Sequence, residues 1–335
     1  MLHFGNSKTT DKKPLKVKND SSTIEIGVVG LGLMGTSILV SLLVSGHKVI
    51  GIAPLPADMD GALDRIQSQL NHASEAGLLK EDVSKYLERL HLSENYEDLR
   101  NCLLVQECVT EVIAIKTEVY KKITQNTESS TVIATNTSAI PISTLQENVS
   151  LPSRFIGIHW AEPAYMTRFL EVTKGEETDE EIAKWVLELA YTWNKEPTYL
   201  KKDIRGFVTN RMLYAVYREM FAILENGEAS MDDIDKAFRY DPGSWMTYMG
   251  LFKRMDQMGL TDYKEIFENL FPQLNNSQTV PPTMQKIVIE KGKGVNNGKG
   301  LYCYTKEEAV KWEEDFKNFN HEIFQLAAQY PEINN

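Results

Sequence analysis

The glycine-rich turn near the start of the chain restricts its fold more than any other feature. Residues 24–29 (IEIGVV) have the apolar, β-branched character of a buried strand, and an apolar helical pattern runs from the turn to about Ser45. Between them lies a G-x-G-x-x-G turn made of Gly30, Leu31, Gly32, Leu33, Met34 and Gly35. Such glycines permit the tight turn, the approach of a pyrophosphate to the backbone and close helix–sheet packing. The sequence therefore predicts a Rossmann unit whose six turn residues bind a dinucleotide; a glycine-rich turn without a ligand is the alternative.

The end of the second strand decides which dinucleotide is expected. Residues 47–53 (HKVIGIA) are interpreted as this strand, and an acidic residue usually stands at its end to bind the ribose of NAD. This chain has Ala53 there, although Asp58 or Asp60 could reach back. No cation stands beside Ala53 to bind the 2′-phosphate of NADP, since Arg65 belongs to the following helix. The sequence favours NAD as cofactor and leaves NADP open.

The order of the apolar patterns divides the chain into an α/β part and a helical part. Short apolar runs alternate with helical patterns up to about residue 203, which is typical of a doubly wound parallel sheet. Only helical patterns follow. The expected fold class is α/β, with an N-terminal Rossmann doubly wound parallel sheet and an all-α C-terminal domain. The expected parts are a flexible N-terminal arm (1–22), an NAD(P)-binding Rossmann domain (23–203), a helical substrate and dimerisation domain (204–304) and a C-terminal helix (305–335).

Particular elements follow from the same patterns. Thr178 with Glu181 predicts a capping box for one helix, and Ser230 with Asp233 a capping pair for another. Beyond the first two, parallel strands are expected in residues 102–106, 132–135, 155–159 and 169–173. Helices are expected in residues 59–70, 83–90, 113–125, 179–193, 206–226, 231–238 and 245–258.

Composition and charge exclude several classes of protein. The 335 residues are 42% hydrophobic and 25% charged, as in globular proteins, and the net charge of −11 disfavours nucleic acid or an anionic membrane as partner. The three cysteines lack metal-ligand spacing, so no metal site is expected. Neither a membrane-spanning apolar segment nor the apolar core of a signal peptide occurs. These features predict a soluble, cytoplasmic protein.

Four polar residues outside the turn are candidates for chemistry: Ser138 after a strand, His159 at a strand end, Glu171 and Asn210. Oxidation of a secondary alcohol by a nicotinamide requires a base for the hydroxyl proton, and a histidine oriented by a carboxylate suits this task. Serine and asparagine donors can hold the substrate oxygen. Each residue also has a structural interpretation: Ser138 as a helix cap, His159 as a structural strand-end histidine, Glu171 as a surface salt-bridge partner and Asn210 as a polar helix residue facing solvent.

Several motifs, in their order along the chain, resemble the 3-hydroxyacyl-CoA dehydrogenase family. The resemblance covers roughly residues 24–304. The segments that carry it are IGVVGLGLMG, ATNTSAIPI, RFIGIHWAEP with FLEV, IRGFVTNRM, GEASMDDIDKAF, GLFKRMDQMGL and GVNNGKGLYCY.

The resemblance implies an activity and a set of roles. His159 and Glu171 match the family's catalytic dyad, and Ser138 and Asn210 match its serine and helix asparagine. Glu107 matches a glutamate near the nicotinamide end of the cofactor, and Asn136 is counted with the cofactor-binding residues. The implied reaction is the reversible NAD-dependent oxidation of an L-3-hydroxyacyl-CoA, a small-molecule thioester, by a homodimer.

The sequence departs from the family at two places. Glu162 stands where the family usually has asparagine, and the segment DMDGALDR is acidic where members often carry lysine near the phosphate end of coenzyme A. These differences leave two alternatives to an acyl-CoA dehydrogenase. One is a dehydrogenase of a free 3-hydroxy acid or sugar acid. The other is an NAD-binding protein with reduced or lost catalysis.

Overall fold

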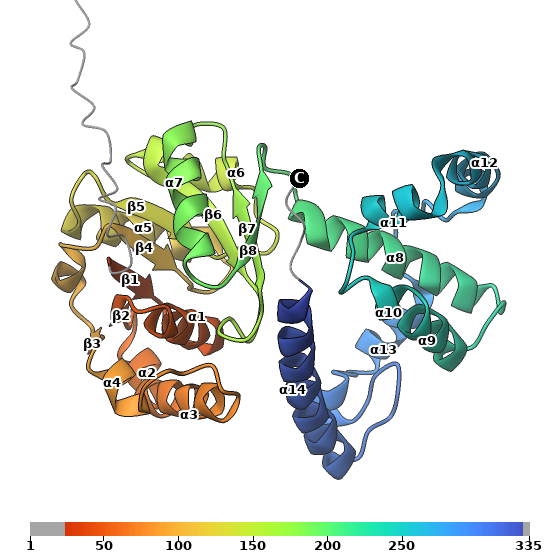
Figure 1. The fold of residues 1–335 in the computed structure, drawn as a ribbon, viewed down its shortest axis with the longest axis horizontal. Helices are drawn as coiled ribbons and strands as arrows, with labels where there is room; N and C mark the ends of the chain where they lie inside the picture. Colours follow the sequence, from red (N-terminus) through yellow and green to blue (C-terminus); the bar gives the residue numbers. More distant parts are fainter. Residues whose placement is uncertain (1–23, 331–335) are drawn as a thin grey trace, which may run out of the picture.

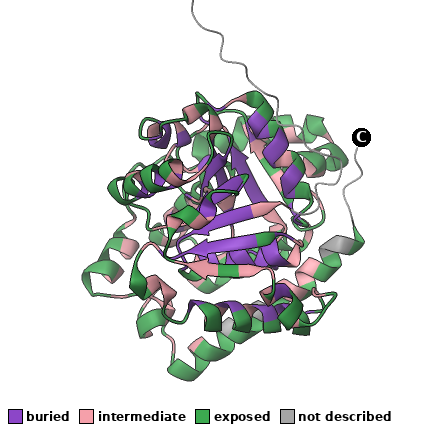
Figure 2. Ribbon diagram, turned by 90° about the vertical axis from the view of Figure 1, so that its left-hand side faces the viewer, coloured by how far each residue is buried: buried purple, intermediate pink, exposed green. Residues whose placement is uncertain are grey.

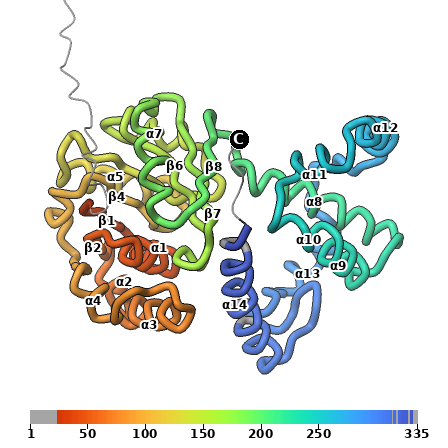
Figure 3. The backbone as a smooth tube through the Cα atoms, viewed as in Figure 1, coloured from red at the N-terminus to blue at the C-terminus, as the bar shows by residue number. Residues whose placement is uncertain are grey.

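The computed structural model describes residues 24–330, which form a sheet covered by helices and a second, helical part (Figure 1). The chain passes between the two parts after β8 (Glu196–Leu200) and enters α8 (Phe207–Glu225). The long helix α14 (Lys306–Gln329) then returns to lie between the two parts (Figure 3). The predicted arm, residues 1–22, falls outside the described residues. No helix among those described is apolar and long enough to cross a membrane.

Within the described residues the strands form one eight-stranded sheet with the order β3-β2-β1-β4-β5-β6-β7-β8. All neighbours pair in parallel except β6 and β7. The central strands are buried on both faces and consist largely of valine, isoleucine and leucine, as parallel strands usually do. The other strands are β1 (Glu25–Val29), β2 (Lys48–Ile52), β3 (Leu90–Ser93), β4 (Leu104–Glu107), β5 (Val132–Thr135), β6 (Phe155–Trp160) and β7 (Phe169–Thr173).

Helices cover both faces of this sheet, so the predicted doubly wound α/β class is confirmed. The buried residues of α1, α3 and α7 pack on one face and those of α5 and α6 on the other, and the central strands are buried between them (Figure 2). On α3 the buried residues Ile66, Leu70 and Ala73 follow helical spacing. These helices are α1 (Leu33–Val44), α2 (Pro56–Met59), α3 (Ala62–Glu75), α4 (Val83–Leu87), α5 (Ile113–Asn126), α6 (Ile142–Gln146) and α7 (Glu180–Tyr191).

Two strands were missing from the expectation, and one was given the wrong direction. β3 and β8 lie at the edges of the sheet, where half-exposed residues leave no continuous apolar run. The expected helix 83–90 therefore ends at Leu87, and its last residue belongs to β3. β7 was expected to be parallel, but residues 161–168 make too short a connection for a parallel crossover, so β7 turns back antiparallel to β6.

Helix boundaries differ from the expectation where a local signal was misread. The expected helix 59–70 is divided at Gly61, which has a φ of +67°, into α2 and α3. The expected capping box of α7 is wrong: Asp179 caps the helix by accepting from Glu181 N at 3.2 Å. The Thr178 hydroxyl instead donates to the carbonyl of Phe155 at 2.7 Å.

The helical part of the described chain contains α8 to α14. The expected capping pair is confirmed, because the Ser230 hydroxyl accepts from Asp233 N at 3.2 Å. The expected helix 245–258 is two helices, and the second begins after Gly250. The remaining helices are α9 (Met231–Tyr240), α10 (Pro242–Trp245), α11 (Leu251–Met258), α12 (Leu260–Leu270) and α13 (Pro282–Ile289).

A buried histidine ties the start of β2 to the end of α7. His47 is fully buried, and its Nε2 accepts from the indole nitrogen of Trp193 at 2.8 Å. Trp193 in turn stacks on Trp160 with 5.3 Å between the ring centroids. Burial lowers the pKa of His47 from 6.5 to about 4, so the ring is neutral in the folded protein.

We expect His47 to make the protein sensitive to acid. Because its folded pKa lies below its unfolded pKa, the stabilisation is complete above pH 6.5 and is lost as the pH falls towards 4. The full effect is roughly 3 kcal/mol. Urea unfolding between pH 7.5 and 4.5 should therefore show a weaker pH dependence in His47→Gln than in the wild type. The control Gln278→Asn, at an exposed position without a titrating group, should keep the wild-type dependence. An unchanged dependence in His47→Gln would contradict this account.

Candidate active site

The candidate residues gather at the carboxyl ends of the central strands. The glycine turn follows β1, Ser138 lies three residues beyond the end of β5, and His159 is the penultimate residue of β6. Ligands of open α/β sheets bind at this edge, where the strand order reverses. The same edge faces α8 of the helical part, which contributes Asn210.

The antiparallel pairing of β6 and β7 brings His159 and Glu171 together. The two residues are direct partners in the register, and directly opposed residues point to the same side of a sheet. The Nδ1 atom of His159 lies 2.8 Å from Oε2 of Glu171. The side chain of Glu171 is 1% exposed and that of His159 is 13% exposed, so only the imidazole reaches the surface of the site.

The second oxygen of Glu171 binds the first turn of α8. Oε1 accepts from Thr209 N at 3.0 Å, from the Thr209 hydroxyl at 3.1 Å and from Val208 N at 3.3 Å. Burial by itself would raise the pKa of Glu171, but the hydrogen bonds from His159 and Thr209 outweigh it and hold the pKa below its usual value. The carboxylate is therefore ionised at neutral pH, and Nδ1 of His159 carries a proton towards it.

The other nitrogen of His159 is left as an acceptor on the open side of the site. The Ser138 hydroxyl lies 3.2 Å from Nε2. The carbonyl of Ser138 accepts from the Asn210 amide at 2.9 Å. The structure thus brings all four predicted residues together: His159 and Glu171 from the sheet, Ser138 from the loop after β5 and Asn210 from α8.

The backbone at the start of α8 is fixed in an unusual conformation. Gly206 and Phe207 have φ values of +80° and +48°. For a phenylalanine this conformation costs about 1–3 kcal/mol, which the surrounding packing must offset. Phe207 is fully buried, and its ring centroid lies 5.8 Å from that of His159. Phe207 therefore fixes the direction of α8 and forms one wall around the imidazole.

The glycine turn fits the pyrophosphate of a dinucleotide. Gly30 has a φ of +103°, and a Cβ on Gly35 would lie 1.7 Å from the carbonyl oxygen of Gly30. At Gly32, by contrast, no atom lies within 4 Å of the position of an added Cβ, so a ligand can approach the backbone there. No side chain caps the N-terminus of α1, which leaves its first N–H groups for the phosphates of NAD.

Two predicted cofactor residues have structural partners. Glu107 is completely buried, and its carboxylate binds Lys116 at 2.9 Å and the hydroxyls of Tyr120 and Thr135 at 3.0 and 2.7 Å. Glu107 thus belongs to an internal ion pair that joins β4, β5 and α5, and its place near the cofactor stays a prediction. The Asn136 side chain accepts from Trp160 N at 3.0 Å and holds the ends of β5 and β6 together.

The sequence interpretation missed Glu111, the carboxylate that does reach the site. Its Oε1 accepts from Ser138 N at 3.2 Å and from the Thr137 hydroxyl, and its Oε2 lies 3.3 Å from Lys116. The Glu111 side chain is 41% exposed. Glu111 could have been found from its position, because it lies just beyond β4, a strand whose carboxyl end borders the site. Thr209 was also missed, because nothing in a helical pattern indicates a partner on another domain.

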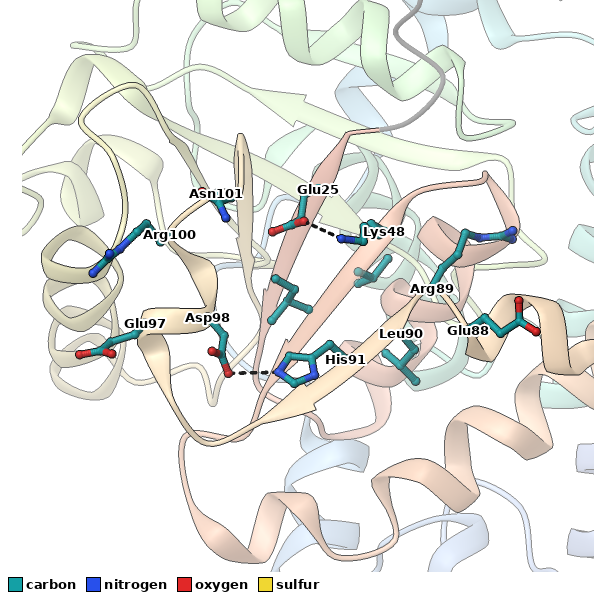
Figure 4. A pocket seen from close by; sticks show the side chains of 12 residues that line it. Glu25, Lys48, Glu88, Arg89, Leu90, His91, Glu97, Asp98, Arg100 and Asn101 are labelled. Carbon is teal, nitrogen blue, oxygen red and sulfur yellow. Dashed lines mark hydrogen bonds and ion pairs between the residues drawn. The ribbon is translucent and has the colours of Figure 1, made fainter.

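A separate cavity lies at the opposite edge of the sheet (Figure 4). It has a volume of about 560 Å³ and borders the first residues of β1, β2 and β3. Its charges are largely paired, with Lys48 3.4 Å from Glu25 and His91 3.1 Å from Asp98. The amino ends of parallel strands are not where such sheets bind nucleotides, so this cavity is not part of the candidate site.

Comparison with known proteins identifies the family. The NAD-binding domain of 3-hydroxyacyl-CoA dehydrogenase matches residues 25–204, and the C-terminal domain of the same family matches residues 206–304. The chain belongs to the 3-hydroxyacyl-CoA dehydrogenase family. It is an NAD-dependent oxidoreductase of that family.

The relatives of this dehydrogenase differ in what their names say they act on. A 5-formyl-3-hydroxy-2-methylpyridine 4-carboxylate 5-dehydrogenase of Mesorhizobium japonicum is 31% identical, over 84% of this chain and 91% of its own. A probable 3-hydroxybutyryl-CoA dehydrogenase of Deinococcus radiodurans is 30% identical over 84% of this chain and all of its own.

Solved structures show the same division. A 5-formyl-3-hydroxy-2-methylpyridine 4-carboxylic acid 5-dehydrogenase, described as an NAD⁺-dependent dismutase, superposes with a TM-score of 0.85 at 28% identity, over 92% of this chain and all of that one. For the (S)-3-hydroxybutyryl-CoA dehydrogenase of Ralstonia eutropha the TM-score is 0.70 at 28% identity, over 84% of this chain and 99% of that one.

We expect Thr209→Val to weaken the dehydrogenase through Glu171. Loss of one hydrogen bond to the carboxylate should lower kcat roughly tenfold, since bonds to charged groups contribute more than neutral ones. A less stabilised carboxylate has a higher pKa, so the acid limb of the kcat/KM profile should move to higher pH. The control Thr117→Val removes a hydroxyl that bonds only to the Ile113 carbonyl and should change neither quantity. An unshifted profile in Thr209→Val would contradict this role.

Proposed function

We propose that this chain catalyses the reversible oxidation of an L-3-hydroxyacyl-CoA to the 3-oxoacyl-CoA, with His159 as the base and Glu171 as the carboxylate that orients it. The observation that carries the proposal is the contact of Nδ1 with Glu171, which turns Nε2 towards Ser138. A neutral imidazole held in this tautomer presents Nε2 as a proton acceptor to the substrate. The intact arrangement argues against the alternative of a protein without catalysis.

The mechanism follows from these contacts. Nε2 of His159 takes the proton of the substrate's 3-hydroxyl group while the carbonyl double bond forms. Bound NAD would accept the hydride that leaves the carbon carrying this hydroxyl group. Glu171 stabilises the imidazolium, which returns its proton to the oxygen in the reverse direction. Ser138 and Asn210 lie beside this position and hold the substrate oxygen as its charge changes.

We expect His159→Ala to lose roughly 10²–10⁴-fold in kcat, the usual contribution of a general base. The substitution leaves the glycine turn intact, so the affinity for NADH, measured by fluorescence titration, should stay within about threefold of the wild type. The matched control is His91→Ala, a histidine on β3 at the opposite edge of the sheet. Undiminished turnover in His159→Ala would remove the proposed base.

A dehydrogenase of a compound without coenzyme A is the second candidate, because one cavity beside the site is acidic. This cavity of about 830 Å³ lies between α3, the loop after β6 and α14. Its lining includes Asp64, Glu75 and Glu162 but no lysine or arginine. Burial raises the pKa of Glu162, partly offset by a hydrogen bond with Ser37. An acidic lining repels the phosphates of coenzyme A. The pyridine carboxylate dehydrogenases named above also support this candidate, because their names describe a substrate without coenzyme A.

A substrate panel separates the two candidates. We expect kcat/KM for 3-hydroxybutyryl-CoA to exceed that for free 3-hydroxybutyrate by about 100-fold or more, since binding energy from the distant arm of a substrate is used in the transition state. Both kcat/KM values are measured from the formation of NADH, which absorbs at about 340 nm. Equal or higher values for free 3-hydroxy acids would favour the second candidate.

We also propose that the protein works as a homodimer. Among the described residues after Phe207, only Phe221 is a buried apolar side chain. Phe252 and Ile289 are 82% and 79% exposed, on α11 and α13. A helical part that leaves so much apolar surface uncovered needs a partner, and a second copy presents the same apolar helices.

Light scattering coupled to gel filtration tests the dimer. We expect twice the mass of one chain for the wild type, and a shift towards the monomer in the double variant Phe252→Asp with Ile289→Asp. Charges placed on an apolar interface are costly to bury, which is the reason for the shift. The exposed control Gln278→Asp should remain dimeric. A folded wild-type monomer at micromolar concentration would contradict the proposal.

A further inference from the structure

The adenosine end of the cofactor site lacks the group that usually selects NAD. The position at the end of β2 is Ala53, which is 2% exposed and has no polar side chain. The carboxylate of Asp58, in the loop that follows, accepts from Leu55 N at 3.2 Å and so bonds within its own loop. A ribose 2′-hydroxyl at this place therefore finds no carboxylate at the end of the strand.

A cation stands there instead. Arg65 lies in the first turns of α3, and its side chain reaches back across the loop after β2 to the glycine turn. Its Nη2 donates to the carbonyl of Leu31 at 2.9 Å, and its Nη1 donates to the carbonyl of Asp60 at 3.2 Å. Arg65 lies on the following helix, as the sequence indicates, and the structure adds its contact with the glycine turn. Its contact with the second residue of the turn places the guanidinium at the adenosine side of the nucleotide site.

The guanidinium keeps unused hydrogen-bonding capacity. The Nε atom of Arg65 is buried and has no hydrogen-bond partner among the described residues. The Tyr96 hydroxyl is likewise buried without a partner within the described part of the chain. Burial, with the carboxylates of Asp58 and Glu107, raises the pKa of Tyr96 to about 12, so its hydroxyl remains a donor. The Nε atoms of Arg89 and Arg168 are also without a partner among the described residues, so the contact with the glycine turn is what distinguishes Arg65.

We propose that Arg65 binds the 2′-phosphate of NADP and that the chain therefore accepts NADP(H) as a second cofactor. A guanidinium forms strong, charge-assisted hydrogen bonds with phosphate oxygens. It is a poor substitute for the carboxylate that accepts from the 2′-hydroxyl of NAD. The acidic residues of the same loop oppose a phosphate, so the site admits both cofactors and does not exclude NAD.

Binding of cofactor fragments tests this directly. Isothermal titration calorimetry would compare ADP-ribose with 2′-phospho-ADP-ribose, which differ only in the phosphate and carry no nicotinamide. The result is independent of the chemistry at His159, so a failure of the proposed reaction would not alter it. The variants are Arg65→Gln, Arg65→Lys and Ala53→Asp. The matched control is Arg89→Gln, because Arg89 also donates to a backbone carbonyl, that of Leu43 at 3.1 Å, but at the other edge of the sheet.

The wild type should bind 2′-phospho-ADP-ribose as tightly as ADP-ribose, or at most about tenfold more weakly. Arg65→Gln should lose about tenfold or more in affinity for the phosphorylated fragment and less than about threefold for the other, with partial recovery in Arg65→Lys. Should Arg65→Gln fail to fold, Ala53→Asp supplies the test: the added carboxylate should weaken only the phosphorylated fragment. A wild type that discriminates against the phosphate by more than about tenfold, or an Arg65→Gln variant that weakens both fragments equally, would overturn the proposal.

Discussion

The carboxylate of Glu171 connects the chemistry of this protein to its architecture. One oxygen accepts a hydrogen bond from Nδ1 of His159. The other accepts hydrogen bonds from two N–H groups and a hydroxyl at the start of α8. The first contact depends on the antiparallel register of β6 and β7, and the second on the unusual backbone at Gly206 and Phe207. The carboxylate that orients the base therefore also joins the sheet to the helical part.

Such a buried carboxylate is stable only when all its partners are present. Removing one partner of a buried ion pair commonly costs 3–5 kcal/mol, because the remaining charge stays desolvated. Glu171 avoids this cost with four hydrogen bonds, and its pKa stays low in spite of burial. The same principle explains Glu107, whose partners Lys116, Tyr120 and Thr135 make it part of the core. The two glutamates look alike in sequence, but one orients a base at the surface of the site and the other holds strands together.

The sequence was sufficient wherever a local signal determined the structure. The glycine turn, the buried central strands and the cap at Ser230 each depend on residues close together in the chain, and each was predicted. The residues of the site were recovered because the order of several motifs resembles one family. Edge strands β3 and β8 were missed, since half-exposed strands lack an apolar run. Arg65, Glu111 and Thr209 could not be placed, because their partners lie on other elements and depend on the folded geometry.

The most direct test of the central claim is a double-mutant cycle on the hydride-transfer rate in single turnovers. If His159 and Glu171 act as one unit, Glu171→Gln should slow the step by orders of magnitude while NADH binding persists, as expected when a base loses its orienting carboxylate. The double variant with His159→Ala should then be no slower than His159→Ala alone. Effects that multiply in the double variant would show two independent residues and would contradict the account.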